Sequence, residues 1–214
     1  MLTRRGMLKT FGGLFAAGFA SSAYAGGIEP LMRLRTTTYR ITPPGWPEGQ
    51  KLRIVALADI HACEPWMTAR RIGDICRYAN DLGGDMIVLL GDYISSMRAV
   101  WRQVPPEMWA AELSVLHAPL GVHAILGNHD WWNDLDAQAA GGGETVSHRE
   151  LRKAGIAIYS NRAARIEAAT GAFWLAGLED QLALRPGRQW NRFGYIGLDD
   201  LPGTLAQVTD DAPL

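Results

Sequence analysis

The chain has 214 residues, of which 48% are hydrophobic and 20% charged, and its formal net charge is −1. These values are typical of a globular protein with a full core, and they exclude a disordered chain and one that lies mostly within a membrane. A slightly acidic chain without a basic run also lacks the electrostatic footprint of a nucleic-acid-binding protein. We therefore expect no nucleic-acid partner.

Residues 1–25 have the pattern of an export signal. Paired Arg4 and Arg5 precede a short apolar stretch, and Ala23-Tyr24-Ala25 has the small-x-small pattern of a cleavage site. The paired arginines resemble a twin-arginine signal, which implies the twin-arginine export machinery as a partner. The apolar stretch is short for a membrane span, so we expect none in the mature chain. We predict a periplasmic domain at 26–214, with membrane association only if the signal stays uncleaved.

The remaining sequence alternates between strand and helix patterns. In chain order it predicts an edge strand at 38–42, a strand at 54–58, a helix at 68–82, a strand at 86–90, a helix at about 105–116, a strand that ends at Gly127, a helix at 144–153, strands at 156–159, 164–167 and 172–176, and a helix at 201–208. Ala168-Ala169-Thr170-Gly171 is a hairpin signal between two of these strands. Such alternation is typical of an α/β fold.

Three apolar runs each end in polar side chains. They lead into Asp59-Ile60-His61, Gly91-Asp92 and Gly127-Asn128-His129-Asp130. Because the runs are continuously apolar, we expect strands that are buried on both faces of a parallel sheet. Ligands gather at the carboxyl ends of such strands. Carboxylates, an imidazole and an amide oxygen suit Mn²⁺, Fe²⁺ or Zn²⁺ better than a thiolate-selective metal.

The three motifs differ in how specific they are. Asp-x-His and Gly-Asp are each weak, because a strand end or an ordinary turn explains them equally well. Gly-Asn-His-Asp is stronger, since a turn needs one special residue and not an amide, an imidazole and a carboxylate in succession. The three together, in this order, favour a hydrolytic metal site over turn chemistry alone.

This motif series resembles that of the calcineurin-like metallophosphoesterase superfamily, in particular its exported bacterial phosphodiesterase-like branch. The resemblance implies a four-layered α/β sandwich of two packed sheets flanked by helices. It also implies two divalent metal ions, Mn, Fe or Zn. By the family pattern, Asp59 and His61 bind the first ion, Asp92 bridges both and Asn128 binds the second.

The resemblance further implies a catalytic pair. His129 would contact the phosphate and protonate the leaving group, with Asp130 orienting it. The implied activity is hydrolysis of a phosphomonoester or phosphodiester by metal-activated hydroxide. The wider branch includes nucleotide-linked and lipid-linked envelope substrates, and no residue here selects between them.

The chain departs from the family pattern near its end, because the expected lone histidine and G-H-x-H motif are absent. His117 and His123 come earlier and are expected in packing or at the surface, and His148 on the polar side of a helix. The second metal site is therefore expected to be incomplete. We expect the chain to be the N-terminal portion of a longer enzyme. The alternative is a non-catalytic metal-binding or interaction domain that lacks the C-terminal ligands.

Two cysteines and four tryptophans complete the candidates. Cys76 has the helical spacing of a buried thiol, and Cys63 lies near the site, although thiolates suit closed structural zinc sites better. The loop aromatics either shape an apolar pocket or serve in packing, which is the preferred interpretation for most of them: Trp131, Trp132, Trp174 and Trp190.

Overall fold

The computed structural model describes residues 3–28, 34–43, 45–187 and 194–214. The chain divides into two units, Met1–Arg40 and Ile41–Leu214. In the first unit, helix α1 (Arg4–Ala23) is followed by a π-helical turn, η1 (Tyr24–Ile28). Thr3 caps α1, and no residue of this helix is buried. No helix among the described residues is long and apolar enough to cross a membrane. Export and cleavage stay predictions.

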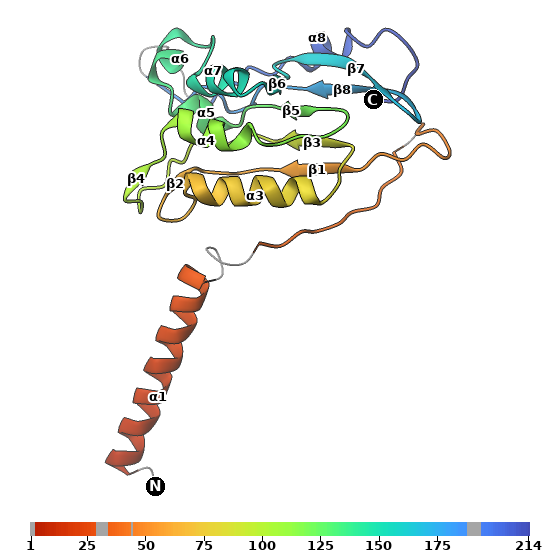
Figure 1. Cartoon of the computed structure of the whole chain (residues 1–214). Coiled ribbons are helices and arrows are strands. Elements are labelled where there is room, and N and C mark those ends of the chain that lie inside the picture. Colours follow the sequence, from red (N-terminus) through yellow and green to blue (C-terminus); the bar gives the residue numbers. More distant parts are fainter. Residues whose placement is uncertain (1–2, 29–33, 44, 188–193) are drawn as a thin grey trace. The chain divides into compact units, whose positions relative to one another are not determined.

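The second unit is built on a four-stranded parallel sheet with the order β1-β3-β5-β6 (Figure 1). Its strands are β1 (Ile54–Leu57), β3 (Met86–Leu89), β5 (Val122–Ala124) and β6 (Ala157–Ile158). This arrangement confirms the predicted α/β class. The register pairs Leu57 with Leu89 and Leu89 with Ala124, so three strands end level with one another. The segments after them therefore emerge side by side.

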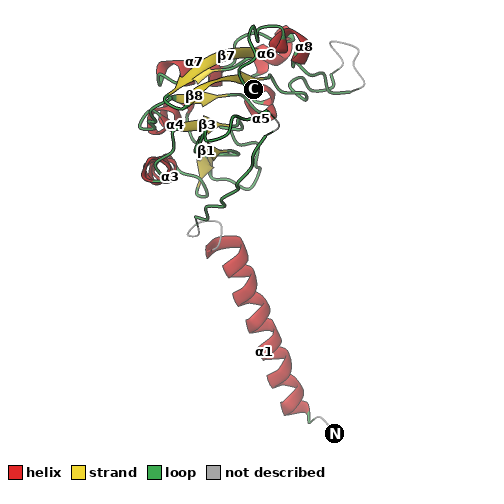
Figure 2. Ribbon diagram, turned by 90° about the vertical axis from the view of Figure 1, so that its right-hand side faces the viewer, coloured by secondary structure: helices red, strands yellow, loops and turns green. Residues whose placement is uncertain are grey.

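Helices α3 (Ala69–Asp81), α4 (Pro106–Leu113) and α7 (Val146–Lys153) lie on the same side of the strands (Figure 2). Each begins close to the predicted residue. Thr145 is the N-cap of α7, and its side-chain oxygen accepts a hydrogen bond from the amide of His148. The helices bury Trp109, Leu113 and Leu151 completely. Burial of a side chain of this size contributes about 1.5–3 kcal/mol. The helical layer thus supplies much of the core above the sheet.

The predicted burial of the strands on both faces holds for β3 and is wrong for β1. All of β3 is buried or nearly so, whereas alternate residues of β1 face solvent and Ile54 is 48% exposed. The reason is position, because β1 lies at the edge of the sheet and β3 has a neighbour on each side. The predicted edge strand at 38–42 is also wrong. These residues pair with no described strand, and Tyr39 and Ile41 remain more than 80% exposed.

The remaining elements are a hairpin of two seven-residue strands and several short strands and helices. The antiparallel pair β7 (Arg162–Ala168) and β8 (Gly171–Gly177) confirms the hairpin, and the end of β8 packs against Tyr159 and Ile125. The other elements are β2 (Cys63–Glu64), which pairs with β4 (Arg102–Gln103), and helices α5 (Asn128–Trp132), α6 (Leu135–Ala140) and α8 (Leu201–Leu205).

The cysteine and tryptophan predictions have mixed outcomes. Cys63 and Cys76 are both buried free thiols, which confirms the expectation for Cys76. Trp131 and Trp174 are buried, as packing predicts. Trp190 lies outside the described residues.

Asn161 ties the C-terminal segments to the start of β7. Its backbone φ is 49°, a left-handed conformation that asparagine tolerates better than most residues. Its side-chain oxygen accepts hydrogen bonds from the amides of Glu179 (3.1 Å) and Asp200 (2.9 Å), and its Nδ2 donates to the carbonyl of Leu198 (2.8 Å). One side chain thus holds two segments, around Glu179 and around Leu198 to Asp200, that have little regular structure of their own.

We expect Asn161→Ala to lower the free energy of unfolding by about 3 kcal/mol. The substitution loses three hydrogen bonds of about 0.5–1.5 kcal/mol each and adds left-handed strain. Asn161→Gly removes the same bonds without the strain, so it should cost about 1 kcal/mol less. Urea unfolding of the two variants measures both terms. Equal stability of Asn161→Ala and the wild type would contradict this role.

Candidate metal centre

The backbone at the strand ends adopts an uncommon conformation. Among the described residues, only four non-glycine residues have positive φ, and three of them are predicted ligands: Asp59 (53°), His61 (46°) and Asp92 (58°). Such conformations cost of order 1–3 kcal/mol and persist where the surroundings impose them. Here the amides of Asp59 and His61 donate to the carbonyls of Gly91 (3.2 Å) and Asp92 (2.8 Å). The backbone therefore aims these side chains before any ligand is present.

Two glycines allow the strand ends to approach closely. A Cβ atom on Gly91 would lie 2.3 Å from the amide nitrogen of Gly127. A Cβ on Gly127 would lie 2.3 Å from Oδ1 of Asp92. Because no side chain fits at either position, the Gly in Gly-Asp and in Gly-Asn-His-Asp sets the distance between the segments after β3 and β5.

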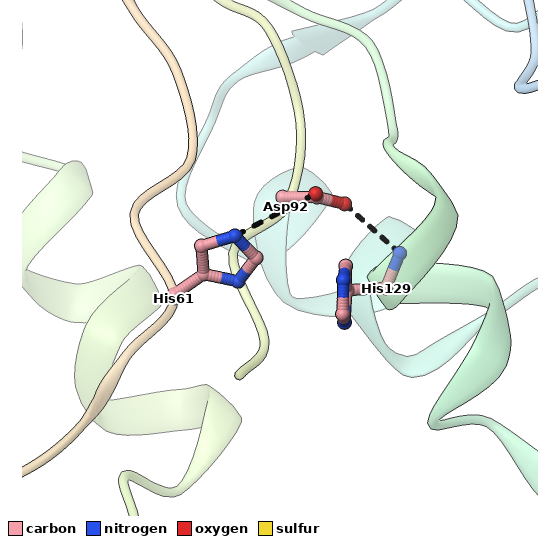
Figure 3. A group of neighbouring side chains, drawn as sticks. All are labelled: His61, Asp92 and His129. Atoms are coloured by element: carbon pink, nitrogen blue, oxygen red, sulfur yellow. Dashed lines mark hydrogen bonds and ion pairs between the residues drawn. The ribbon is translucent and has the colours of Figure 1, made fainter. Parts of the chain in front are cut away.

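Three side chains from separate strand ends form a cluster, namely His61, Asp92 and His129 (Figure 3). One donor atom from each lies within 4.8 Å of the others. Oδ1 of Asp92 accepts a hydrogen bond from the amide of His129 (2.9 Å), and Oδ2 lies 3.7 Å from Nε2 of His61. The latter distance is long for a hydrogen bond. It is close to the roughly 3.0–3.5 Å between two ligands that each lie about 2.1 Å from one ion.

The tautomer of His61 also suits a metal. Its Nδ1 lies 3.2 Å from the carbonyl oxygen of Ile94, which only accepts hydrogen bonds, so Nδ1 carries the proton. Nε2 then presents a lone pair to the cluster, in the arrangement found in metal-binding histidines. Oδ1 of Asp59 lies 3.6 Å from the same Nε2, and the Asp59 side chain is 70% exposed. The structure therefore brings Asp59, His61 and Asp92 together around one point.

Asn128 begins α5 immediately before His129. Its side chain is half-buried and makes no hydrogen bond with any described residue. Its amide oxygen is thus available to a ligand. Its role as a metal ligand stays a prediction, as do the roles of the other site residues.

Ser96, and not the expected Asp130, lies at hydrogen-bond distance from the ring of His129. Nδ1 of His129 lies 2.6 Å from Oγ of Ser96, and Nδ2 of Asn133 donates to the same oxygen at 2.8 Å. Burial lowers the pKa of His129, and the negative charge of Asp92 opposes that shift. Ser96 was not found from the sequence, because nothing in a Ser-Ser pair marks a contact with a histidine 33 residues away. Asn133, four residues after His129, was not found either, because its contact is with Ser96.

Asp130 does not orient His129 directly. Its carboxylate accepts hydrogen bonds from the backbone amides of Asp92 (2.9 Å), Tyr93 (3.0 Å) and Gly127 (3.0 Å), and from the hydroxyl of Ser147 (3.0 Å). It is completely buried, and a buried carboxylate must take whatever donors surround it. Burial raises the pKa of Asp130 to about 6, although the amides act in the opposite direction. Asp130 therefore holds the backbone of the loop that carries Asp92 in place.

His148 corrects another prediction. It is buried rather than exposed on the polar side of its helix, and its Nε2 lies 3.0 Å from Oγ of Ser160 and 3.3 Å from Oε1 of Glu179. Burial opposes the ionisation of Glu179, but hydrogen bonds from His148, Ser160 and Trp131 hold the pKa of Glu179 below its ordinary value. The reason for the error is that Nδ1 of His148 accepts from the amide of Thr145, which turns the ring into the interior.

The other two histidines lie away from the cluster. His123 is buried in β5, with its Nε2 2.7 Å from the carbonyl of Leu120. His117 is exposed in the loop after α4. Both outcomes match the expected packing and surface roles.

The charges around the cluster fit a cation. Burial raises the pKa of Asp180, and the nearby carboxylate of Asp92 raises it further. Negative charge therefore accumulates around Asp92, whose carboxylate raises the pKa of both Asp130 and Asp180. The mixed oxygen and nitrogen donor set suits a borderline divalent ion. We conclude that the residues present fit a divalent metal.

The sequence comparisons agree with this geometry. The family model described as calcineurin-like phosphoesterase matches residues 52–180, and the chain belongs to this family. The match contains all three strand-end motifs. The family implies metal-dependent hydrolysis of phosphate esters.

Curated relatives are more distant. The chain is 28% identical over 152 residues to the UDP-2,3-diacylglucosamine pyrophosphatase LpxG of Chlamydia trachomatis, covering 69% of this chain and 44% of that protein. It is 27% identical over 216 residues to an uncharacterized metallophosphoesterase, YkuE, of Bacillus subtilis, covering 98% and 66%. An Aquifex aeolicus metallophosphoesterase is 28% identical over 155 residues, covering 72% and 52%. The chain thus spans about half to two thirds of the length of these relatives. No solved structure matches it significantly.

Proposed function

We propose that this chain is a metal-dependent hydrolase that cleaves a phosphomonoester or phosphodiester by metal-activated hydroxide. The observation that supports it most is the cluster of His61, Asp92 and His129. These residues come from three separate strand ends, and their donor atoms converge within 4.8 Å. The tautomer of His61, with Nε2 free to bind an ion, and the excess of carboxylates also favour binding of a divalent metal.

The side chains divide into two groups in this proposal. Asp59, His61, Asp92 and Asn128 would hold the metal, Mn, Fe or Zn. A divalent ion bound there lowers the pKa of water to near neutrality and polarises a phosphoryl oxygen. His129 contacts the phosphate and gives a proton to the leaving oxygen. Because Ser96 engages Nδ1, it is Nε2 of His129 that is left for the substrate.

The proposed substrate is a phosphate ester, without a specified leaving group. The relative from Chlamydia trachomatis is named for the hydrolysis of a nucleotide-linked diphosphate. Nucleotide-linked and lipid-linked phosphate esters are therefore the first compounds to test after simple chromogenic substrates.

The test is hydrolysis of bis(p-nitrophenyl) phosphate and p-nitrophenyl phosphate by the purified chain. With Mn²⁺ or Zn²⁺ we expect turnover at least about a hundredfold above that in EDTA, because the metal supplies several kcal/mol of charge stabilisation. Adding metal back should restore it. The metal content of the protein is measured in the same samples. Bound metal without turnover of either substrate would overturn the proposal and favour a non-catalytic metal-binding domain.

A further inference from the structure

A cavity of about 610 Å³ with a mixed polar and apolar lining borders the candidate metal centre. This volume lies within the range of small-molecule sites, about 300–1,000 Å³. Its charged and polar lining residues come from the segment after β3, from β4, from the end of α5 and from the segment after β8. They are Ser95, Ser96, Arg98, Gln103, Asn133 and Arg185. None of the described residues that line the cavity is acidic.

The two arginines of the cavity have no carboxylate partner. No ion pair involving Arg98 or Arg185 occurs within the described ranges, and both residues are exposed. The backbone amide of Arg185 donates to Oε1 of Gln138 (3.0 Å), and its guanidinium lies 4.8 Å from the ring centre of Trp132. Arg185 is therefore held in place by contacts that leave its charge uncompensated. Two uncompensated guanidinium groups in one cavity favour an anionic ligand.

The cavity is linked to the metal centre through His129. Ser96 and Asn133 line the cavity, and Oγ of Ser96 lies 2.6 Å from Nδ1 of His129. Trp132, which carries the Arg185 guanidinium, has its ring centre 5.1 Å from that of His129. A group in the cavity is therefore separated from the cluster by about one side chain. That is close enough for one small ligand to reach both.

We propose that this cavity binds a second phosphoryl group of the substrate, so that the substrate is a diphosphate diester and not a simple phosphomonoester. The proposal rests on the proposed function, because it assigns the scissile phosphate to the metal centre. Arg98 and Arg185 present planar guanidinium groups that match phosphate oxygens in pairs. The neutral lining supplies further hydrogen-bond donors, the hydroxyl of Ser95 and the amide of Gln103.

The reaction balances as a hydrolysis. Water oxygen forms a bond to the scissile phosphorus, and the bond from that phosphorus to the bridging oxygen breaks. The bridging oxygen leaves with the second phosphoryl group, giving two phosphomonoesters and releasing the two protons of water. The arginines would stabilise the negative charge that this leaving group gains.

The test is binding of methylenediphosphonate, which has two phosphoryl groups and cannot be hydrolysed. Inorganic phosphate is the single-phosphoryl comparison. Titration calorimetry with Mn²⁺ present and at constant ionic strength lets one phosphoryl group reach the metal centre while the other occupies the cavity. We expect methylenediphosphonate to bind the wild type at least tenfold more tightly than phosphate. The double substitution Arg98→Gln with Arg185→Gln should weaken that binding at least tenfold.

Arg53→Gln is the matched control. Arg53 precedes β1 and therefore lies at the opposite end of the strands from the candidate site, so its substitution should change neither affinity by more than about twofold. Equal affinity of the wild type for the two probes, or no loss in the double variant, would overturn the subsite. Circular dichroism checks that the double variant is folded.

Turnover of bis(p-nitrophenyl) phosphate, which has one phosphate, is compared with that of UDP-glucose, which has two, at saturating Mn²⁺. A preference for UDP-glucose that disappears in the double variant supports the subsite. If neither compound is hydrolysed while methylenediphosphonate binds through the arginines, the proposed function fails and the anion subsite stands. The two failures are thus distinguishable.

Discussion

Asp92→Asn is expected to lower kcat/KM for phosphate-ester hydrolysis by about a thousandfold or more. The Asp92 carboxylate lies between the two histidines of the cluster, with one oxygen on the amide of His129 and the other facing Nε2 of His61. Asparagine keeps an oxygen that can accept the His129 amide, so the local backbone should survive. It removes the negative charge that draws a cation to this point. A loss of about 4 kcal/mol of metal-dependent stabilisation corresponds to about a thousandfold in rate.

Thermal stability gives a second measurement that does not depend on turnover. A metal present at a hundred times its dissociation constant stabilises the folded state by about 2.7 kcal/mol. The wild type should therefore melt at a higher temperature in Mn²⁺ than in EDTA, and Asp92→Asn should lose most of this difference. Asp74→Asn is the control, since Asp74 pairs with Arg77 on the exposed surface of α3. An unchanged metal-dependent shift in Asp92→Asn would show that Asp92 is not a ligand.

The sequence predicted those parts of the site that depend on strand ends. The apolar runs identified β1, β3 and β5, and parallel strands in level register must bring their following segments together. The proximity of Asp59, His61, Asp92 and His129 was predicted in this way. The glycines before Asp92 and Asn128 were also informative, because close approach of two segments leaves no room for a side chain.

The parts that depend on long-range packing were not predictable. The hydroxyl of Ser96 reaches His129 only because the segment after β3 curves over α5. The ring of His148 is turned inward by the amide of Thr145, but its partner there, Glu179, is distant in sequence. The apolar pattern of β1 is the same as that of β3, and only the sheet order decides that one of them is an edge strand. Local patterns specify elements, but the partners of polar side chains follow from how the elements pack.

The hydrogen bonds of Asp130 lead to the second large effect. One carboxylate oxygen accepts from the amides of Asp92 and Gly127, and the other from the amides of Tyr93 and Ile94 and the hydroxyl of Ser147. Five donors from three segments thus converge on one buried side chain. In Asp130→Asn an NH₂ group replaces one of these oxygens and faces donors that it cannot pair with. Unpaired buried donors cost about 1–3 kcal/mol each.

We therefore expect Asp130→Asn to lower the free energy of unfolding by about 3 kcal/mol and the melting temperature by about 6–12 °C. Removal of a buried charge returns part of the loss, which is why the expected cost is less than the sum for all donors. Asp136→Asn, on the exposed surface of α6, should leave the melting temperature unchanged. Affinity for Mn²⁺ should also fall in Asp130→Asn, because the segment that presents Asp92 loses its anchor. A variant that melts like the wild type and binds Mn²⁺ equally well would refute the idea that Asp130 positions Asp92.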